Sequence, residues 1–308
     1  MPLVIPDLRA ERAVLVLLSD PHTHAGALAT AAAATSSRLL VVLLSSPGSS
    51  WNSLQSTLTF AYTAASQVVF AMEKPLMDID VVIGAERGAS EETRWDRVFR
   101  VGNATVPAWL RGVPTVDLPA ADDAQLSVAA QSDADALEAF PVVALGGTFD
   151  HLHAGHKILL SMAASVATRK VIVGVTDDAL LVRKKNKHLL ESLDIRIARV
   201  RDFLHMFKPS LQLEIVPIQD VYGPTAWDAD VQALVVSRET LPGAASIAEL
   251  RSQKNLPELK VFIIDVVSSD ASQTLASDLD AGALVAGKMS STAIRQWIAD
   301  HGQQPNAS

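Results

Sequence analysis

The chain has 308 residues with a formal net charge of −8, and it contains no cysteine. The lack of cysteine excludes disulfides, thiol nucleophiles and thiolate metal sites, and the acidic balance argues against a nucleic-acid partner. No apolar run approaches the roughly 18 residues of a membrane span, so we expect a soluble, cytoplasmic protein with no membrane partner. The length favours about two domains.

The N-terminal half begins with an apolar run at residues 13–18, which is too short for a signal peptide and is interpreted as a core strand. An Ala-rich helix and a second strand at 39–44 follow. The stretch 119–139 is rich in Ala and Asp and lacks a strand period, which is typical of a connection. We therefore predict an N-terminal α/β domain over residues 1–138 and a second domain over 139–308.

The second domain opens with the most informative stretch of the chain. An apolar strand at 141–145 runs into G-G-T-F-D-H-L-H-A-G-H at 146–156, and a helix follows. A glycine-rich turn from strand to helix is where an α/β sheet binds phosphate, because backbone N–H groups and the helix dipole point there. His153 and His156 share one helix face, and Gly155 lets a ligand approach the backbone.

Strands and helices alternate through the rest of this domain. We predict strands at 171–175, 213–218, 233–236 and 260–265, and helices at 193–207, 243–255 and 291–301. Pro209 ends the first of these helices, and residues 268–286 are expected to form a loop. The alternation predicts an α/β fold with a Rossmann-like, doubly wound parallel sheet.

Two segments of the N-terminal half echo the second domain. Residues 20–27 (D-P-H-T-H-A-G-A) parallel 150–156, with His24 at the place of His153, and residues 81–87 parallel 234–240. Either the first domain is a degenerate duplicate of the second, or Ala-rich segments coincide by chance. Ala27 stands at the place of the second histidine, so we assign this domain no chemistry.

The H-x-G-H signature directly after G-G-T-F-D, together with K-M-S-S-T-A-I-R at 288–295, resembles the adenylyl- and cytidylyltransferase superfamily. Further blocks resemble the eukaryotic-type phosphopantetheine adenylyltransferase family, and they lie at 173–175, 178–181, 208–211, 222–224 and 235–240. That family makes dephospho-coenzyme A and pyrophosphate from ATP and 4′-phosphopantetheine. The resemblance implies a nucleotidyltransferase catalytic domain at 139–308, behind an N-terminal extension. The chain ends at Ser308, soon after the second motif, so we expect one activity only.

The resemblance also implies roles for individual residues of this chain. The catalytic residues would be His156, Lys184 and Thr148. ATP would be bound by Gly146, Gly147, His153, Gly155, Ser237, Glu239, Ser290, Ser291, Thr292 and Arg295. The acceptor would be bound by Thr148, Phe149, Asp150, Lys184 and Tyr222. No metal-binding residue is expected, since Mg²⁺ would arrive with ATP through its phosphates. Other enzymes of coenzyme A synthesis are candidate partners.

Several alternatives explain the motifs less well. Residues 282–289 approach a P-loop, but Met289 replaces the hydroxyl that would hold magnesium. The two motifs lie too close together for an aminoacyl-tRNA synthetase. His151, His153 and His156 lack the further ligands of a zinc site. Another small-molecule nucleotidyltransferase, or a nucleotide-binding pseudoenzyme acting as a scaffold, remains as an alternative function, although no motif residue is missing.

Overall fold

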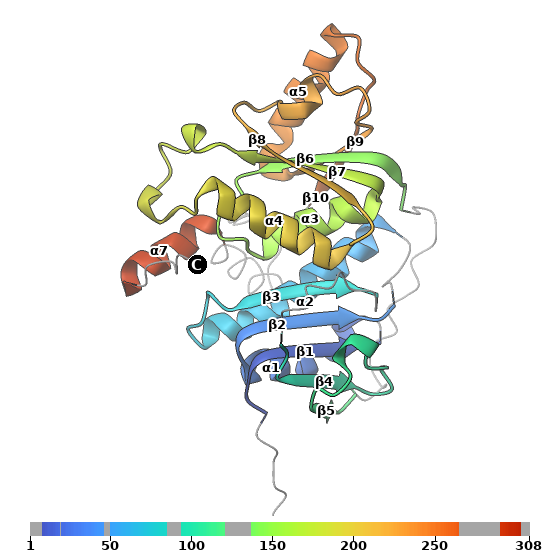
Figure 1. Cartoon of the computed structure of the whole chain (residues 1–308), viewed down its shortest axis with the longest axis vertical. Helices are drawn as coiled ribbons and strands as arrows, with labels where there is room; N and C mark the ends of the chain where they lie inside the picture. Colours follow the sequence, from blue (N-terminus) through green and yellow to red (C-terminus); the bar gives the residue numbers. More distant parts are fainter. Residues whose placement is uncertain are drawn as a thin grey trace, which may run out of the picture. The chain divides into compact units, whose positions relative to one another are not determined.

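The computed structural model describes residues 8–18, 20–45, 50–84, 94–120, 137–264 and 290–302. The chain forms two compact units, residues 1–136 and 137–308 (Figure 1). This division falls beside the predicted boundary between residues 138 and 139. The predicted loop at 268–286, the P-loop-like segment and Lys288 lie outside the described residues, as does most of the predicted connection.

The N-terminal unit is a five-stranded parallel sheet in the order β3-β2-β1-β4-β5. Its strands are β1 (Ala10–Leu17), β2 (Thr35–Leu43), β3 (Asp78–Ile83), β4 (Arg97–Val101) and β5 (Thr115–Leu118). Its helices are η1 (Pro21–His24), α1 (Ala25–Ala34), α2 (Trp51–Ala71) and η2 (Ala108–Leu110). Residues 13–17 and 39–43 are completely buried, as expected of parallel strands covered on both faces.

The C-terminal unit is a second five-stranded parallel sheet, in the order β10-β9-β6-β7-β8. Its strands are β6 (Phe140–Gly147), β7 (Ala167–Thr176), β8 (Gln212–Ile218), β9 (Ala233–Ser237) and β10 (Lys260–Ile264). Its α-helices are α3 (Ala154–Val166), α4 (Leu193–Phe207), α5 (Leu241–Gln253) and α7 (Ser291–His301). Short 3-10 turns are η4 (Asp178–Leu180), η5 (Lys187–Leu189), η6 (Gly223–Ala226) and η7 (Arg238–Thr240).

Helices cover both faces of the second sheet. Val142, Ala144 and Ile172 form one apolar cluster with Ala244 and Ile247 of α5. Successive side chains of a strand alternate between faces, so the neighbouring strand residues point to the other side. There α3 and α4 pack together against β6, β7 and β8 (Figure 1). The predicted Rossmann-like, doubly wound α/β fold is therefore confirmed.

The two units share a topology. Counted within each unit, the strand order is third, second, first, fourth, fifth in both. The first strand pair carries a register shift at the same place, after Ala10 in one unit and after Phe140 in the other. The first α-helix also runs into the second strand without a loop in both, at Thr35 and at Ala167. These shared irregularities favour duplication over a chance likeness of Ala-rich segments.

The second echo between the halves is wrong as a correspondence of strands. Residues 81–83 belong to β3, the third strand of its unit, whereas residues 234–237 belong to β9, the fourth. Both strands are short, buried and rich in Val, and such runs look alike wherever they stand in a parallel sheet. Among the described residues, no helix is both long and apolar enough to cross a bilayer.

Candidate functional site

The turn between β6 and α3 carries the histidine motif on a constrained backbone. β6 is the central strand, paired with β7 and β9, so the turn lies where strand order reverses at the carboxyl edge of the sheet. Phe149 and His151 both adopt left-handed conformations, with φ of 52° and 43°. Such conformations cost about 1–3 kcal/mol each and persist only where the surroundings hold them. Gly147 makes room, because a β-carbon there would lie 3.1 Å from the Phe149 ring.

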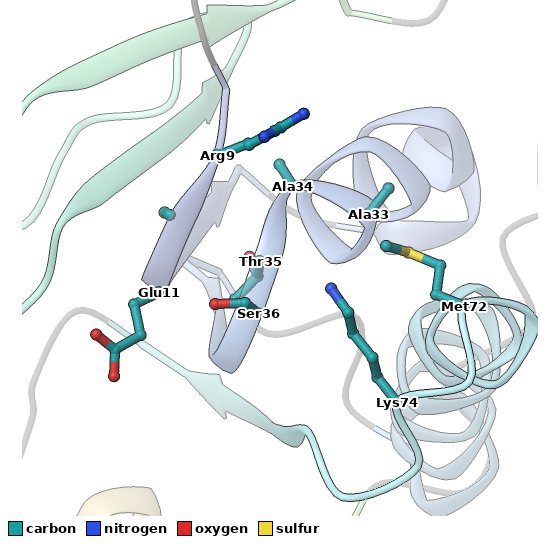
Figure 2. Close-up of a pocket in the computed structure, with 9 residues that line it drawn as sticks. Arg9, Glu11, Ala33, Ala34, Thr35, Ser36, Met72 and Lys74 are labelled. Carbon is teal, nitrogen blue, oxygen red and sulfur yellow. The ribbon is translucent and has the colours of Figure 1, made fainter.

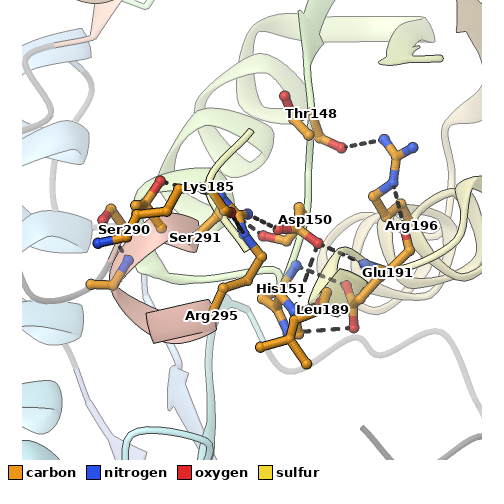
Figure 3. Close-up of polar contacts among 12 residues, drawn as sticks. Thr148, Asp150, His151, Lys185, Leu189, Glu191, Arg196, Ser290, Ser291 and Arg295 are labelled. Atoms are coloured by element: carbon orange, nitrogen blue, oxygen red, sulfur yellow. Dashed lines mark hydrogen bonds and ion pairs between the residues drawn. The ribbon is translucent and has the colours of Figure 1, made fainter. Parts of the chain in front are cut away.

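Asp150, between these two residues, is completely buried, and two hydrogen bonds join its segment to Glu191. The backbone N–H of Glu191 donates to Asp150 Oδ1 at 2.9 Å, and the backbone N–H of His151 donates to Glu191 Oε2 at 2.8 Å. His151 Nε2 lies 2.8 Å from the carbonyl oxygen of Leu189. Figure 3 shows this exchange, which fixes the turn to the segment ahead of α4.

Helix α7 is attached to the same turn. The Ser291 hydroxyl donates to the carbonyl oxygen of Asp150 at 2.8 Å, and Arg295 Nη1 donates to Asp150 Oδ2 (Figure 3). Ser290 caps the helix by accepting from the N–H of Ala293 at 3.2 Å. The first and second motifs, which are far apart in sequence, therefore meet at Asp150.

A second arginine, Arg196 of α4, ties the carboxyl ends of β6 and β7 together. It is completely buried, and its Nη1 donates to the carbonyl oxygens of Thr148 and Thr176 at 2.8 Å each. Its Nε donates to the carbonyl oxygen of Glu191 at 3.0 Å, and its Nη2 pairs with Asp178. Arg196 thus sets the backbone position of Thr148, a predicted catalytic residue.

Sequence reasoning missed Glu191 and Arg196. An arginine in a helix is ordinarily solvated, but Arg196 is completely buried, whereas the apolar Ile197 beside it is partly exposed. The available signal is that Arg196 precedes the buried Val200 by four residues, one helical turn on the same face. This spacing places Arg196 on the buried face of α4, but the residue type alone favours a solvated guanidinium.

The two histidines of the motif stack on each other. Their ring centroids are 3.9 Å apart at an interplanar angle of 28°, and the Phe149 ring lies 5.3 Å from that of His156. His153 is the N-cap residue of α3, yet its side chain makes no capping hydrogen bond. The Nδ1 atoms of both rings are buried without a hydrogen-bond partner among the described residues. Buried polar atoms of this kind ordinarily have partners, so the pair is suited to a polar ligand.

Both imidazoles are neutral at neutral pH. Burial lowers the pKa of His153 to about 3, with smaller contributions from the charges of Lys157 and His151. Burial also holds the pKa of His156 well below its usual value, with further contributions from His153 and Lys184. Both residues keep part of their surface exposed, although the Nδ1 atoms do not. The pair therefore offers hydrogen bonds and little charge.

The depressed pKa predicts a pH dependence of stability. An unfolded histidine binds a proton near pH 6.5, whereas folded His153 resists protonation down to about pH 3. The contribution of neutral His153 to the free energy of unfolding is thus complete above pH 6.5 and is lost as the pH falls toward 3. We expect the Tm of the wild type to fall more between pH 7 and pH 5 than that of His153→Asn, measured by thermal unfolding. His205→Asn, at an exposed position of α4, should keep the wild-type slope. Equal slopes for all three proteins would contradict the assignment.

The basic loop after β7 contains one lysine whose charge acts on His156. Lys184 is exposed, and its charge contributes to the lowered pKa of His156. Lys187 is also exposed and begins η5. The backbone of Lys185 accepts a hydrogen bond from Arg295 Nε at 3.0 Å, so the loop is fixed to α7. The structure therefore gathers the first motif, the second motif and the basic loop in one place.

Three predicted site residues have no described contact with this group. Ser237 ends β9, beside the central strand, where its hydroxyl and that of Thr240 cap η7. Glu239 lies exposed in that turn. Tyr222 packs against the apolar cluster beneath α5. Their predicted contacts with ATP or acceptor remain predictions, as do those of Gly146 and of Gly155 in the first turn of α3.

A zinc site is not supported by the described residues. Within them, no group of three His, Asp or Glu side chains is placed to hold a metal ion. His151 instead bonds to the Leu189 carbonyl, and its ring Nδ1 lies 3.8 Å from a carboxylate oxygen of Glu191.

The corresponding turn of the N-terminal unit makes different contacts. His22 Nδ1 lies 2.6 Å from Asp20 Oδ1, and its ring stacks on Phe60 at a centroid distance of 4.1 Å. His24 precedes α1 as His153 precedes α3, but the buried Ala27 stands where a second histidine would be needed. Absence of chemistry in this unit remains a prediction.

A pocket of about 510 Å³ lies at the opposite end of the N-terminal sheet. Figure 2 shows it between the starts of β1 and β2 and the segment that follows α2, with Glu11, Ser36 and Lys74 among its lining residues. Ligands of open α/β sheets bind outside the carboxyl ends of the strands. This pocket is at the amino ends, so we assign it no role in catalysis.

Comparison with known proteins identifies the family. The cytidylyltransferase-like family matches residues 144–297, from within β6 to within α7. The chain belongs to the cytidylyltransferase-like family. The cytidylyltransferase-like region includes both sequence motifs and the residues that bond to Asp150. The region makes up half of the chain and lies within the C-terminal unit.

Relatives of this cytidylyltransferase-like chain include phosphopantetheine adenylyltransferases. It is 45% identical over 128 residues to that of Saccharomyces cerevisiae, covering 42% of each chain. It is 43% identical over 131 residues to that of Methanopyrus kandleri, covering 42% of this chain and 82% of the other. It is 42% identical over 158 residues to an uncharacterized protein of Schizosaccharomyces pombe, covering 51% and 48%. The match spans less than half the length of both fungal relatives. The predicted resemblance to phosphopantetheine adenylyltransferases is therefore confirmed.

Proposed function

We propose that the chain transfers AMP from ATP to 4′-phosphopantetheine. The phosphate of the acceptor attacks the α-phosphorus of ATP in line, the bond to the β-phosphate oxygen breaks, and pyrophosphate leaves with dephospho-coenzyme A as the product. The observation that carries the proposal is the meeting of both phosphate motifs at Asp150, beside two histidines with unpartnered Nδ1 atoms. The named relatives support the acceptor.

In this proposal the residues of the chain bind and orient phosphates. His156 donates to the α-phosphate as its charge grows, and His153 contacts the leaving phosphates. Lys184 joins the attacking phosphate to the α-phosphate as a mobile point charge. The N-terminus of α7 offers backbone N–H groups and a favourable dipole to the β- and γ-phosphates. Mg²⁺ accompanies ATP through its phosphates and neutralises charge that develops there. A cytoplasmic location and contacts with other enzymes of coenzyme A synthesis remain predictions.

The test is pyrophosphate release from Mg-ATP with a panel of phosphorylated acceptors. We expect turnover with 4′-phosphopantetheine and none with nicotinamide mononucleotide, or with CTP and phosphocholine. Turnover with another acceptor alone would refute the substrate while retaining nucleotidyl transfer. ATP binding without turnover for any acceptor would favour the pseudoenzyme alternative.

A further inference from the structure

Arg295 of α7 is engaged on every nitrogen of its guanidinium group. Only 1% of the residue is exposed. Its Nη1 pairs with Asp150 Oδ2, and its Nε donates to the carbonyl oxygen of Lys185 at 3.0 Å (Figure 3). Its Nη2 donates to Thr292 Oγ1 at 3.3 Å. Three of its five N–H donors thus face protein oxygens, and a residue with 1% of its surface exposed offers little to a ligand.

Asp150 is likewise held by hydrogen bonds to other parts of the protein. Its Oδ1 accepts from the backbone of Glu191, its Oδ2 accepts from Arg295, and its carbonyl oxygen accepts from Ser291. The backbone on both sides is left-handed, so the residue cannot turn toward a ligand without the whole turn rearranging. Asp150 and Arg295 thus form one unit that joins the first motif to the second.

Within the part of the chain that the structure describes, few apolar contacts hold α7 in place. The buried part of its cluster consists of Ile294 and Ile298 with Leu189, and Trp297 packs against them partly exposed. A helix with so small an apolar contact depends on its polar bonds for its exact orientation. Its first turn, which contains Ser290 and Ser291, is attached mainly through Asp150.

We propose that Asp150 and Arg295 are positioning residues whose ion pair sets the N-terminus of α7 against the histidine turn, so that both motifs meet the phosphates of one ATP molecule. The inference rests on the proposed function in taking ATP as the ligand. It replaces the predicted direct contacts, of Arg295 with ATP and of Asp150 with the acceptor, by indirect ones. Neither side chain needs to touch either substrate.

The test measures binding of a non-hydrolysable ATP analogue with Mg²⁺ by calorimetry, without any acceptor. The variants are Asp150→Asn, Arg295→Gln and the double variant. We expect each single substitution to weaken binding on the order of ten-fold, and the double variant to be no weaker than the worse single one, because both act through one pair. The exposed pair Arg100 and Asp117 of the N-terminal unit provides matched controls. Arg100→Gln and Asp117→Asn should bind as the wild type does.

Direct contact predicts the opposite sign for one variant. If Arg295 were an ATP ligand, Asp150→Asn would release its guanidinium, and binding would stay unchanged or tighten while Arg295→Gln weakened it. That result would overturn the positioning role. A single variant leaves an unpaired buried charge and is at risk of unfolding, whereas the double variant leaves none. Wild-type affinity in a folded double variant would therefore also overturn it.

The acceptor plays no part in this measurement, so the result is separate from the acceptor panel. A wild type that binds the analogue but turns over no acceptor would count against the proposed function and leave the comparison of variants intact. A wild type that binds no ATP analogue would overturn both.

Discussion

Replacing His156 with alanine is expected to lower kcat by roughly 10²- to 10³-fold, the usual loss when one donor to the transition state is removed. The neutral ring packs against the rings of His153 and Phe149, and these contacts orient it before the ligand arrives. ATP affinity should fall much less, because the hydrogen bond strengthens only as charge develops on the α-phosphate. Steady-state kinetics and calorimetry with ATP measure the two effects.

The exposed His205 of α4 serves as the control for this substitution. His205→Ala should leave both kcat and ATP affinity at wild-type values. If ATP affinity in His156→Ala falls as far as kcat/KM, the ring binds ground state and transition state equally, and its assigned role is wrong.

Lys184→Ala is expected to slow turnover by about 10²-fold or more, because it removes a positive charge from the reacting phosphates. Lys187→Ala should change kcat by less than about two-fold, as is usual for a solvated surface charge. Both lysines are exposed and belong to one basic run, but only Lys184 contributes to the lowered pKa of His156. The same pyrophosphate assay compares them.

The salt dependence separates a specific contact from a general field. A specific Lys184 contact predicts a large kcat difference between the two variants at low and at high ionic strength. Equal losses at both positions, disappearing with added salt, would mean that the run acts as a diffuse positive patch.

Much of the fold follows from periodicity. The last helix spans Ser291–His301 as predicted, and β8 and β10 begin or end within one residue of their predicted bounds. Apolar periodicity and N-cap residues carry this information. Strand order is not local, because a short buried run pairs equally well at several positions of a parallel sheet. For the same reason, residues 81–83 of β3 resemble β9 in sequence although the two strands hold different places in their sheets.

The candidate site was predictable where a motif fixes both residue type and neighbourhood. The motif places His153 and His156 on one helix face, and the structure stacks their rings. The contacts of Asp150 with Glu191 and Arg295 were not predictable, since these residues lie 41 and 145 residues away in the sequence. Buried ion pairs depend on tertiary packing, and one sequence alone does not show which charges are buried.

The left-handed residues on either side of Asp150 have a consequence for ligand affinity. Buried carboxylates and arginines hold this turn in one strained conformation. The turn therefore loses its conformational entropy when the chain folds, before any ligand binds. An incoming nucleotide then need not order the turn, so more of its interaction energy is available as affinity. Weakening the hydrogen bonds and the ion pair around Asp150 would move that entropic penalty to the binding step, even if every atom that touches the nucleotide were left unchanged.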